Sequence, residues 1–136
     1  GLSTTDATAA LYGTTTLAEI EHRCRARAES LGLALAFQQS NHEGAVVDMI
    51  QDACDHADAL VINPAGLSFH SIPVLDALKM FKGPLIELHL SNVHARDELH
   101  RHSIMSATAT AVICGLGAYG YLAAVDAAHH LLGARA

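Results

Sequence analysis

Aromatic side chains are scarce in this sequence. They make up only 4 % of the 136 residues, and tryptophan is absent. Apolar residues nevertheless account for 51 % of the chain, and the mean hydropathy is +0.25. A core built from these residues must therefore be aliphatic and rich in alanine. The surplus of small apolar residues favours a protein whose faces are covered by other subunits.

Long apolar runs and basic clusters are also missing. No run approaches the roughly 20 apolar residues that a membrane-spanning helix needs, and no signal-peptide pattern is present. Lys and Arg together number 8 against 14 Asp and Glu, which gives a formal net charge of −6. Without a basic block, the sequence predicts neither nucleic-acid binding nor attachment to a membrane.

Cysteine is rare, with 3 residues and no paired spacing. Such usage is typical of reduced thiols in a cytoplasmic protein. Cys24 and Cys54 fall at the spacing of helix-core positions, and Cys114 lies in an apolar run. We therefore expect all three to have structural roles.

Helical and strand patterns alternate along the chain, which is short enough for a single domain over residues 1–136. Residues 1–11 are small and polar without periodicity, which predicts a loop. Amphipathic spacing and helix-start signals predict four helices, over 17–31, 47–57, 71–80 and 119–132. Short apolar runs predict strands over 33–37, 59–62, 84–90 and 110–114. This alternation predicts an α/β fold with a doubly wound parallel sheet.

Polar side chains follow two of these predicted strands. The strand predicted at 84–90 ends in a polar group made up of His89, Ser91, Asn92 and Arg96. The strand predicted at 59–62 is followed by Asn63. Open α/β sheets place their ligand sites at the carboxyl ends of the strands. An imidazole there can transfer a proton, and a guanidinium can bind an anionic substrate.

Other candidate sites are weaker. His89, His94, His100 and His102 lack the usual paired spacing of metal ligands, so the sequence does not predict a metal site. The segment 115–117 has two glycines, but it lacks the third glycine that a dinucleotide-binding fingerprint needs. Asn41 and Glu43 fit two alternatives equally well, a structural turn with a helix cap or a pair of ligands.

Several short motifs carry a resemblance to a known family. They are Tyr12-Gly13, the loop at 39–44, Ile62-Asn63-Pro64, Asp76-Ala77-Leu78, the segment 89–96, His102-Ser103 and the run at 112–117. In this order and spacing, the chain resembles the type II 3-dehydroquinate dehydratases. The resemblance implies a flavodoxin-like three-layer sandwich, a homo-oligomer that is a dodecamer, and no cofactor. It also implies a cytoplasmic hydro-lyase that converts 3-dehydroquinate to 3-dehydroshikimate in the shikimate or quinate pathway.

The resemblance also implies roles for individual residues. Tyr12 matches the family's base and His89 its acid, and Glu87 is placed to orient His89. Four predicted substrate-binding residues match family positions: Asn63, Asp76, Leu90 and Ser91. Arg96, His100 and Arg101 are added to them because they follow the His89 strand. Of the four matched residues, Asp76 corresponds to one that reaches into the site of a neighbouring subunit.

Several positions depart from the family pattern. The family opens with a central strand ending in Asn-Gly-Pro-Asn-Leu-Asn, which this chain is expected to lack. Phe69 stands where a substrate-binding His is expected, Leu75 and His100 replace arginines, and the Arg that activates the family's Tyr is missing. A phenol with a pKa of about 10 needs a nearby cation to act as a base at neutral pH. We therefore expect Arg96 or Arg101 to lie in the same cleft as His89.

These departures leave a second hypothesis open. The chain would then be a non-catalytic or substrate-shifted relative that keeps the fold and binds a carboxylated ring ligand. A third hypothesis, a flavodoxin-like module that binds a nucleotide, has no phosphate-binding loop to support it.

Overall fold

The computed structural model describes residues 1–7, 15–95 and 102–135. Tyr12, Arg96, His100 and Arg101, to which the sequence assigns site roles, lie outside these residues. Eleven elements follow one another along the described chain: β1 Leu2–Asp6, α1 Leu17–Ser30, β2 Leu35–Gln39, α2 Glu43–His56, β3 Ala59–Asn63, η1 Ala65–Phe69, α3 Ile72–Lys79, β4 Leu85–His89, η2 Val93–Ala95, β5 Ala111–Cys114 and α4 Tyr119–Arg135.

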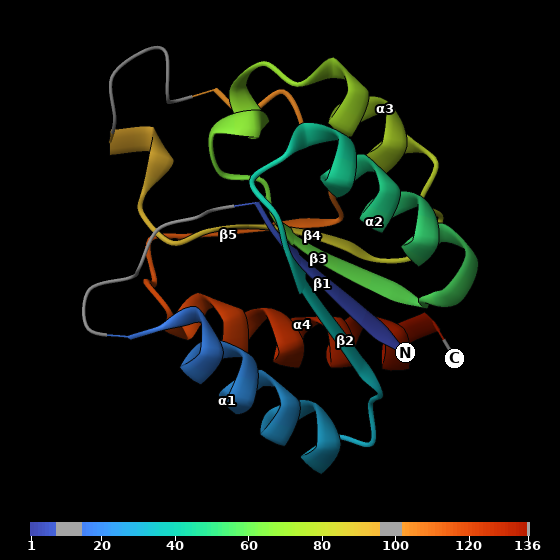
Figure 1. The fold of residues 1–136 in the computed structure, drawn as a ribbon. Helices are drawn as coiled ribbons and strands as arrows, with labels where there is room; N and C mark the ends of the chain where they lie inside the picture. Colours follow the sequence, from blue (N-terminus) through green and yellow to red (C-terminus); the bar gives the residue numbers. More distant parts are fainter. Residues whose placement is uncertain (8–14, 96–101, 136) are drawn as a thin grey trace.

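The strands form one parallel sheet in the order β2-β1-β3-β4-β5. This is the strand order of flavodoxin-like folds. Helices α1 and α4 cover one face of the sheet, and α2 and α3 cover the other (Figure 1). The predicted doubly wound α/β fold is therefore confirmed. Among the described residues, no helix has the length and apolar character needed to cross a membrane.

The sheet separates two apolar clusters. Side chains alternate across each strand, so Val61, Ile86 and Leu88 pack toward α1 and α4, whereas Leu60 and Ile62 pack toward α2 and α3. Strands β3 and β4 are buried along their whole length, as parallel strands between two helical layers must be.

The prediction of a loop at residues 1–11 is wrong over β1. Leu2–Asp6 forms a fully buried strand that pairs with both β2 and β3. The expected absence of a central opening strand is wrong for the same reason. Ser3, Thr4 and Thr5 look like loop residues because they are polar and small. Threonine is β-branched, however, and the backbone pairing on both sides outweighs the cost of burying its hydroxyl.

The helix of residues 43–56 buries a different stripe from the one predicted. Val46, Ile50 and Ala53 are buried, whereas Cys54 is exposed. Cys54 is therefore not a core residue, although Cys24 is fully buried as expected. The remaining predicted helices are confirmed, with boundaries shifted by a few residues. Helix α1 begins as predicted, because the Thr16 hydroxyl accepts a hydrogen bond from the Glu19 N–H at 3.1 Å.

Candidate functional site

Three buried polar side chains lie at the carboxyl ends of neighbouring strands. Asp6 ends β1, Asn63 ends β3 and His89 ends β4, with exposed fractions of 0 %, 3 % and 4 %. This edge includes the point between β1 and β3 where the strand order reverses. In flavodoxin-like sheets, ligands bind at this point. The polar ends of β3 and β4 therefore meet where the sequence predicts a site.

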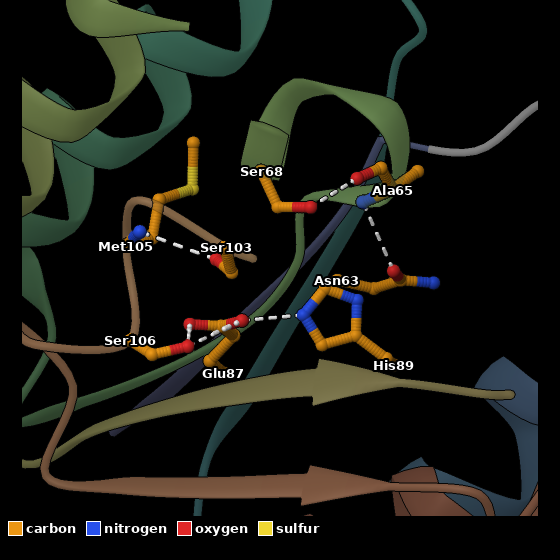
Figure 2. Close-up of polar contacts among 8 residues, drawn as sticks. All are labelled: Asn63, Ala65, Ser68, Glu87, His89, Ser103, Met105 and Ser106. Atoms are coloured by element: carbon orange, nitrogen blue, oxygen red, sulfur yellow. Dashed lines mark hydrogen bonds and ion pairs between the residues drawn. The ribbon is translucent and has the colours of Figure 1, made fainter. Parts of the chain in front are cut away.

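The imidazole of His89 contacts the carboxylate of Glu87. Because the two residues are separated by one position in β4, both side chains project from the same face of the sheet. His89 Nε2 and Glu87 Oε2 form a short hydrogen-bonded contact (Figure 2). With Nε2 on the carboxylate, the second ring nitrogen, Nδ1, points away from Glu87. The structure thus places Glu87 where the sequence expects it, as the residue that orients His89.

The Glu87 carboxylate is kept ionised inside the protein. Glu87 is only 1 % exposed, and burial by itself would raise its pKa. The hydrogen bond and charge of His89, with hydrogen bonds from Ser103 and Ser106, outweigh burial and hold the pKa of Glu87 below its ordinary value. A carboxylate that stays charged beside an imidazole fixes the orientation of the ring through the hydrogen bond to Nε2.

Asn63 is held in place by backbone and side-chain bonds. Its Nδ2 donates to Asp6 Oδ2 at 3.2 Å, and its Oδ1 accepts from the Ala65 N–H at 3.2 Å. The Tyr121 hydroxyl of α4 also donates to Asp6. Ala65 has a φ of 49°, which is uncommon for a residue other than glycine. The Asn63 side chain therefore stabilises a strained turn directly after β3.

The other predicted site residues that the structure describes are more exposed than Asn63 and His89. Leu90 is half-buried and Ser91 is exposed, and both directly follow His89 at the end of β4. Asp76 is exposed on α3, which leaves its carboxylate available to a neighbouring molecule. The cation expected near Tyr12 stays a prediction, since Arg96 and Arg101 are not among the described residues.

The departures from the family pattern have structural counterparts. Phe69 is half-buried in η1, and the adjacent His70 is exposed. Leu75 packs against the apolar cluster beneath α2 and α3, as its side chain allows and an arginine would not. Glu43 accepts a hydrogen bond from Ser71 at 2.6 Å, so its carboxylate links two helices within the protein. This contact favours the structural alternative for Glu43.

Sequence patterns assign no role to four residues of this site: Asp6, Ser103, Ser106 and Tyr121. Ser103 belongs to the His102-Ser103 motif, but the resemblance implies no function for it. Ser103 and Ser106 lie three positions apart in a turn that returns to Glu87, and only the folded chain brings them there. Asp6 escapes prediction because the polar composition of its strand is typical of a loop.

The fold and the site define an α/β protein equipped for acid–base chemistry at the carboxyl edge of a parallel sheet. The family model "Dehydroquinase class II" matches residues 5–129. The chain belongs to this family.

Known relatives agree with this assignment. The chain is 50 % identical over 124 residues to a 3-dehydroquinate dehydratase of Caulobacter sp. strain K31, covering 91 % of this chain and 84 % of the relative. It is 52 % identical over 116 residues to catabolic 3-dehydroquinase 1 of Neosartorya fischeri, covering 85 % and 77 %. The crystal structure of the type II dehydroquinase from Propionibacterium acnes superposes with a TM-score of 0.88 at 34 % identity, covering 95 % of this chain and 94 % of the other.

Proposed function

We propose that this protein is a 3-dehydroquinate dehydratase, a hydro-lyase that eliminates water from 3-dehydroquinate to give 3-dehydroshikimate. The observation that carries the proposal is the buried pair of His89 and Glu87 at the end of β4, in a chain of the class II dehydroquinase family. Relatives named 3-dehydroquinate dehydratase and catabolic 3-dehydroquinase support the same reaction.

The elimination needs three contributions. A base removes the proton next to the carbonyl, polar groups stabilise the resulting enolate, and an acid protonates the departing hydroxyl. We assign the acid to His89, whose Nδ1 is directed away from the carboxylate that holds Nε2. We assign the base to Tyr12, on the resemblance of the Tyr12-Gly13 motif to the family.

Substrate binding is assigned to residues around these two. Asn63 presents a side chain held by Asp6 and Ala65, which suits a group that contacts a substrate hydroxyl. We assign Leu90 and Ser91, which directly follow the acid in the chain, to binding of the substrate carboxylate. The other assigned residues are Arg96, His100 and Arg101 of the same chain and Asp76 of a neighbouring subunit.

Assembly into a homo-oligomer, a dodecamer, is part of the proposal. Exposed apolar side chains lie at both ends of helix α3, where Ile72 is 56 % exposed and Met80 is 69 % exposed. The exposed Asp76 lies between them in the sequence. Covering such side chains with another subunit would bury apolar surface and bring Asp76 to the neighbour. Light scattering measures the oligomeric state directly, and a stable monomer would contradict the proposed assembly.

We also propose a cytoplasmic location, which the three free cysteines support.

The activity is tested by adding 3-dehydroquinate to the purified full-length protein and following the absorbance of the conjugated enone product. Turnover is expected, and it should fall by about 100-fold or more in His89→Asn, because general acid catalysis commonly contributes that much. The asparagine introduced by this substitution keeps a polar group of similar size but cannot donate a proton as an acid. Tight binding without turnover at high protein concentration would overturn the enzyme assignment and favour a ligand-binding relative.

A further inference from the structure

The carboxylate of Glu87 contacts more than one side chain. Besides its contact with His89, it accepts the Ser106 hydroxyl hydrogen, with Ser106 Oγ 3.0 Å from Oε1 and 3.2 Å from Oε2 (Figure 2). The Ser103 hydroxyl also helps to lower the pKa of this carboxylate. A carboxylate that is 1 % exposed depends on such donors, since water cannot replace them.

The turn that carries these serines is anchored on both sides. Ser103 Oγ accepts from the Met105 N–H at 3.2 Å, and the Ile104 N–H donates to the Ser68 carbonyl at 2.8 Å. Met105 is 1 % exposed and packs into the apolar cluster under α2 and α3. The position of Ser106 is therefore fixed by bonds and packing that do not involve Glu87.

A fixed donor beside Glu87 has a consequence for His89. The carboxylate can rotate about its terminal bond, and the Ser106 hydroxyl contacts both of its oxygens. Holding the carboxylate in one orientation holds Nε2 of His89, and thereby the direction in which Nδ1 points. Without Ser106, the carboxylate would have fewer orienting contacts, and the imidazole would sample other orientations.

We propose that Ser106 is a positioning residue for proton transfer at His89, acting through the Glu87 carboxylate. The Ser106 hydroxyl bonds to Glu87 and lies on a different segment from the acid, so its effect on His89 passes through that carboxylate. The proposal rests on the proposed function, because the proton at His89 is the one given to the departing hydroxyl.

The test compares three variants of the full-length protein with 3-dehydroquinate as substrate. Ser106→Ala should lower kcat about 10-fold, with KM changed by less than about two-fold, because the lost hydrogen bond to a charged group misplaces the acid without removing a substrate contact. Ser106→Thr keeps the hydroxyl and should restore most of kcat. Ser71→Ala is the matched control, since Ser71 also donates its hydroxyl hydrogen to a glutamate carboxylate, that of Glu43.

The outcomes separate this proposal from a merely structural role. An unchanged kcat in Ser106→Ala would overturn it, and so would an equal loss in Ser71→Ala or a failure of Ser106→Thr to restore activity. A wild-type protein without turnover would instead overturn the proposed function. In that case, NMR still tests the role of Ser106. The imidazole N–H signal of His89 can be assigned by its absence from the spectrum of His89→Asn. It should be slow to exchange with water in the wild type and broadened in Ser106→Ala, and an unchanged signal would contradict the proposal.

Discussion

Ser71 joins the amino ends of two helices by donating its hydroxyl hydrogen to Glu43 Oε2 at 2.6 Å. The same hydroxyl oxygen accepts from the Val74 N–H at 3.2 Å and so caps α3. One buried side chain thus stabilises the first turn of α3 and fixes it against α2, which carries Glu43 at its start.

Removing the Ser71 hydroxyl should therefore cost more than removing an ordinary cap. We expect Ser71→Ala to lower the free energy of unfolding by about 2 kcal/mol, at the upper end for helix caps. The matched control is Thr16→Ala, because Thr16 caps α1 through a bond from the Glu19 N–H, which involves no carboxylate. Its expected loss is about 1 kcal/mol. Urea unfolding measures both, and equal losses would show that the Glu43 bond adds nothing.

The protein should become more stable when the threonines of β1 lose their hydroxyls. Thr4 and Thr5 are buried at 1 % and 0 % exposure, and their hydroxyl oxygens have no hydrogen-bond partner within the part of the chain that the structure describes. Thr5→Val keeps the shape of the side chain and removes a buried polar group, which should raise the free energy of unfolding by about 1 kcal/mol.

The control for this prediction is the same substitution at a threonine that has a partner. Thr110 Oγ1 accepts from the Leu85 N–H at 3.0 Å, so Thr110→Val should lower the stability by about 1 kcal/mol. The melting temperatures of the two variants should therefore move in opposite directions. A decrease in Thr5→Val would contradict the absence of a partner for its hydroxyl.

Gly83 should tolerate no side chain, because a Cβ there would lie 2.1 Å from the Asp58 carbonyl oxygen. Both groups belong to backbone segments that precede β4 and β3, so the turn would have to shift. We expect Gly83→Ala to cost about 2 kcal/mol or more, within the range for overpacking. Gly133→Ala in α4 is the control, since nothing lies within 4 Å of its Cβ position. It should stabilise the helix by up to about 1 kcal/mol, and thermal unfolding distinguishes the two.

The charge of Glu87 should make the free energy of unfolding depend on pH in the acidic range. Burial would raise the pKa of Glu87, but His89 and the two serines hold it below the ordinary value of 4.5. The unfolded carboxylate therefore binds protons at a higher pH than the folded one. The resulting stabilisation is fully present above about pH 4.5 and is lost as the pH falls through the lowered pKa.

The variant Glu87→Gln removes this dependence. Its melting temperature should lie well below that of the wild type near pH 7, and the difference should shrink as the pH falls below about 4.5. Calorimetry over this range measures the difference directly. A difference that is constant with pH would mean that the folded carboxylate does not carry the charge that the structure assigns to it.

Local patterns in the sequence predict most of the fold, and the misses have physical causes. The strands at 59–62 and 84–90 could be predicted because a strand buried on both faces must be apolar throughout. Strand β1 could not, since Ser3, Thr4 and Thr5 carry a loop-like composition and owe their conformation to pairing with distant strands.

The site, too, combines local contacts that the sequence predicts with long-range contacts that it does not. His89 and Glu87 are two positions apart in one strand, so their contact follows from the alternation of side chains. Ser106 reaches the same carboxylate from a separate turn, 19 positions later in the sequence. No local pattern encodes that approach, which depends on Met105 and the backbone bond to Ser68.

The position of β1 between β2 and β3 also constrains the order in which the protein can be assembled. During synthesis on the ribosome this strand leaves the exit tunnel before either of its partners, which follow after α1 and after α2. Its backbone groups must remain hydrated until Ala59–Asn63 has been made, because only then is there a strand on each side. Parallel pairing between segments distant in sequence is slow to form. The nascent chain therefore reaches its native sheet only after β3 has emerged, and chaperones have this interval in which to bind the incomplete protein.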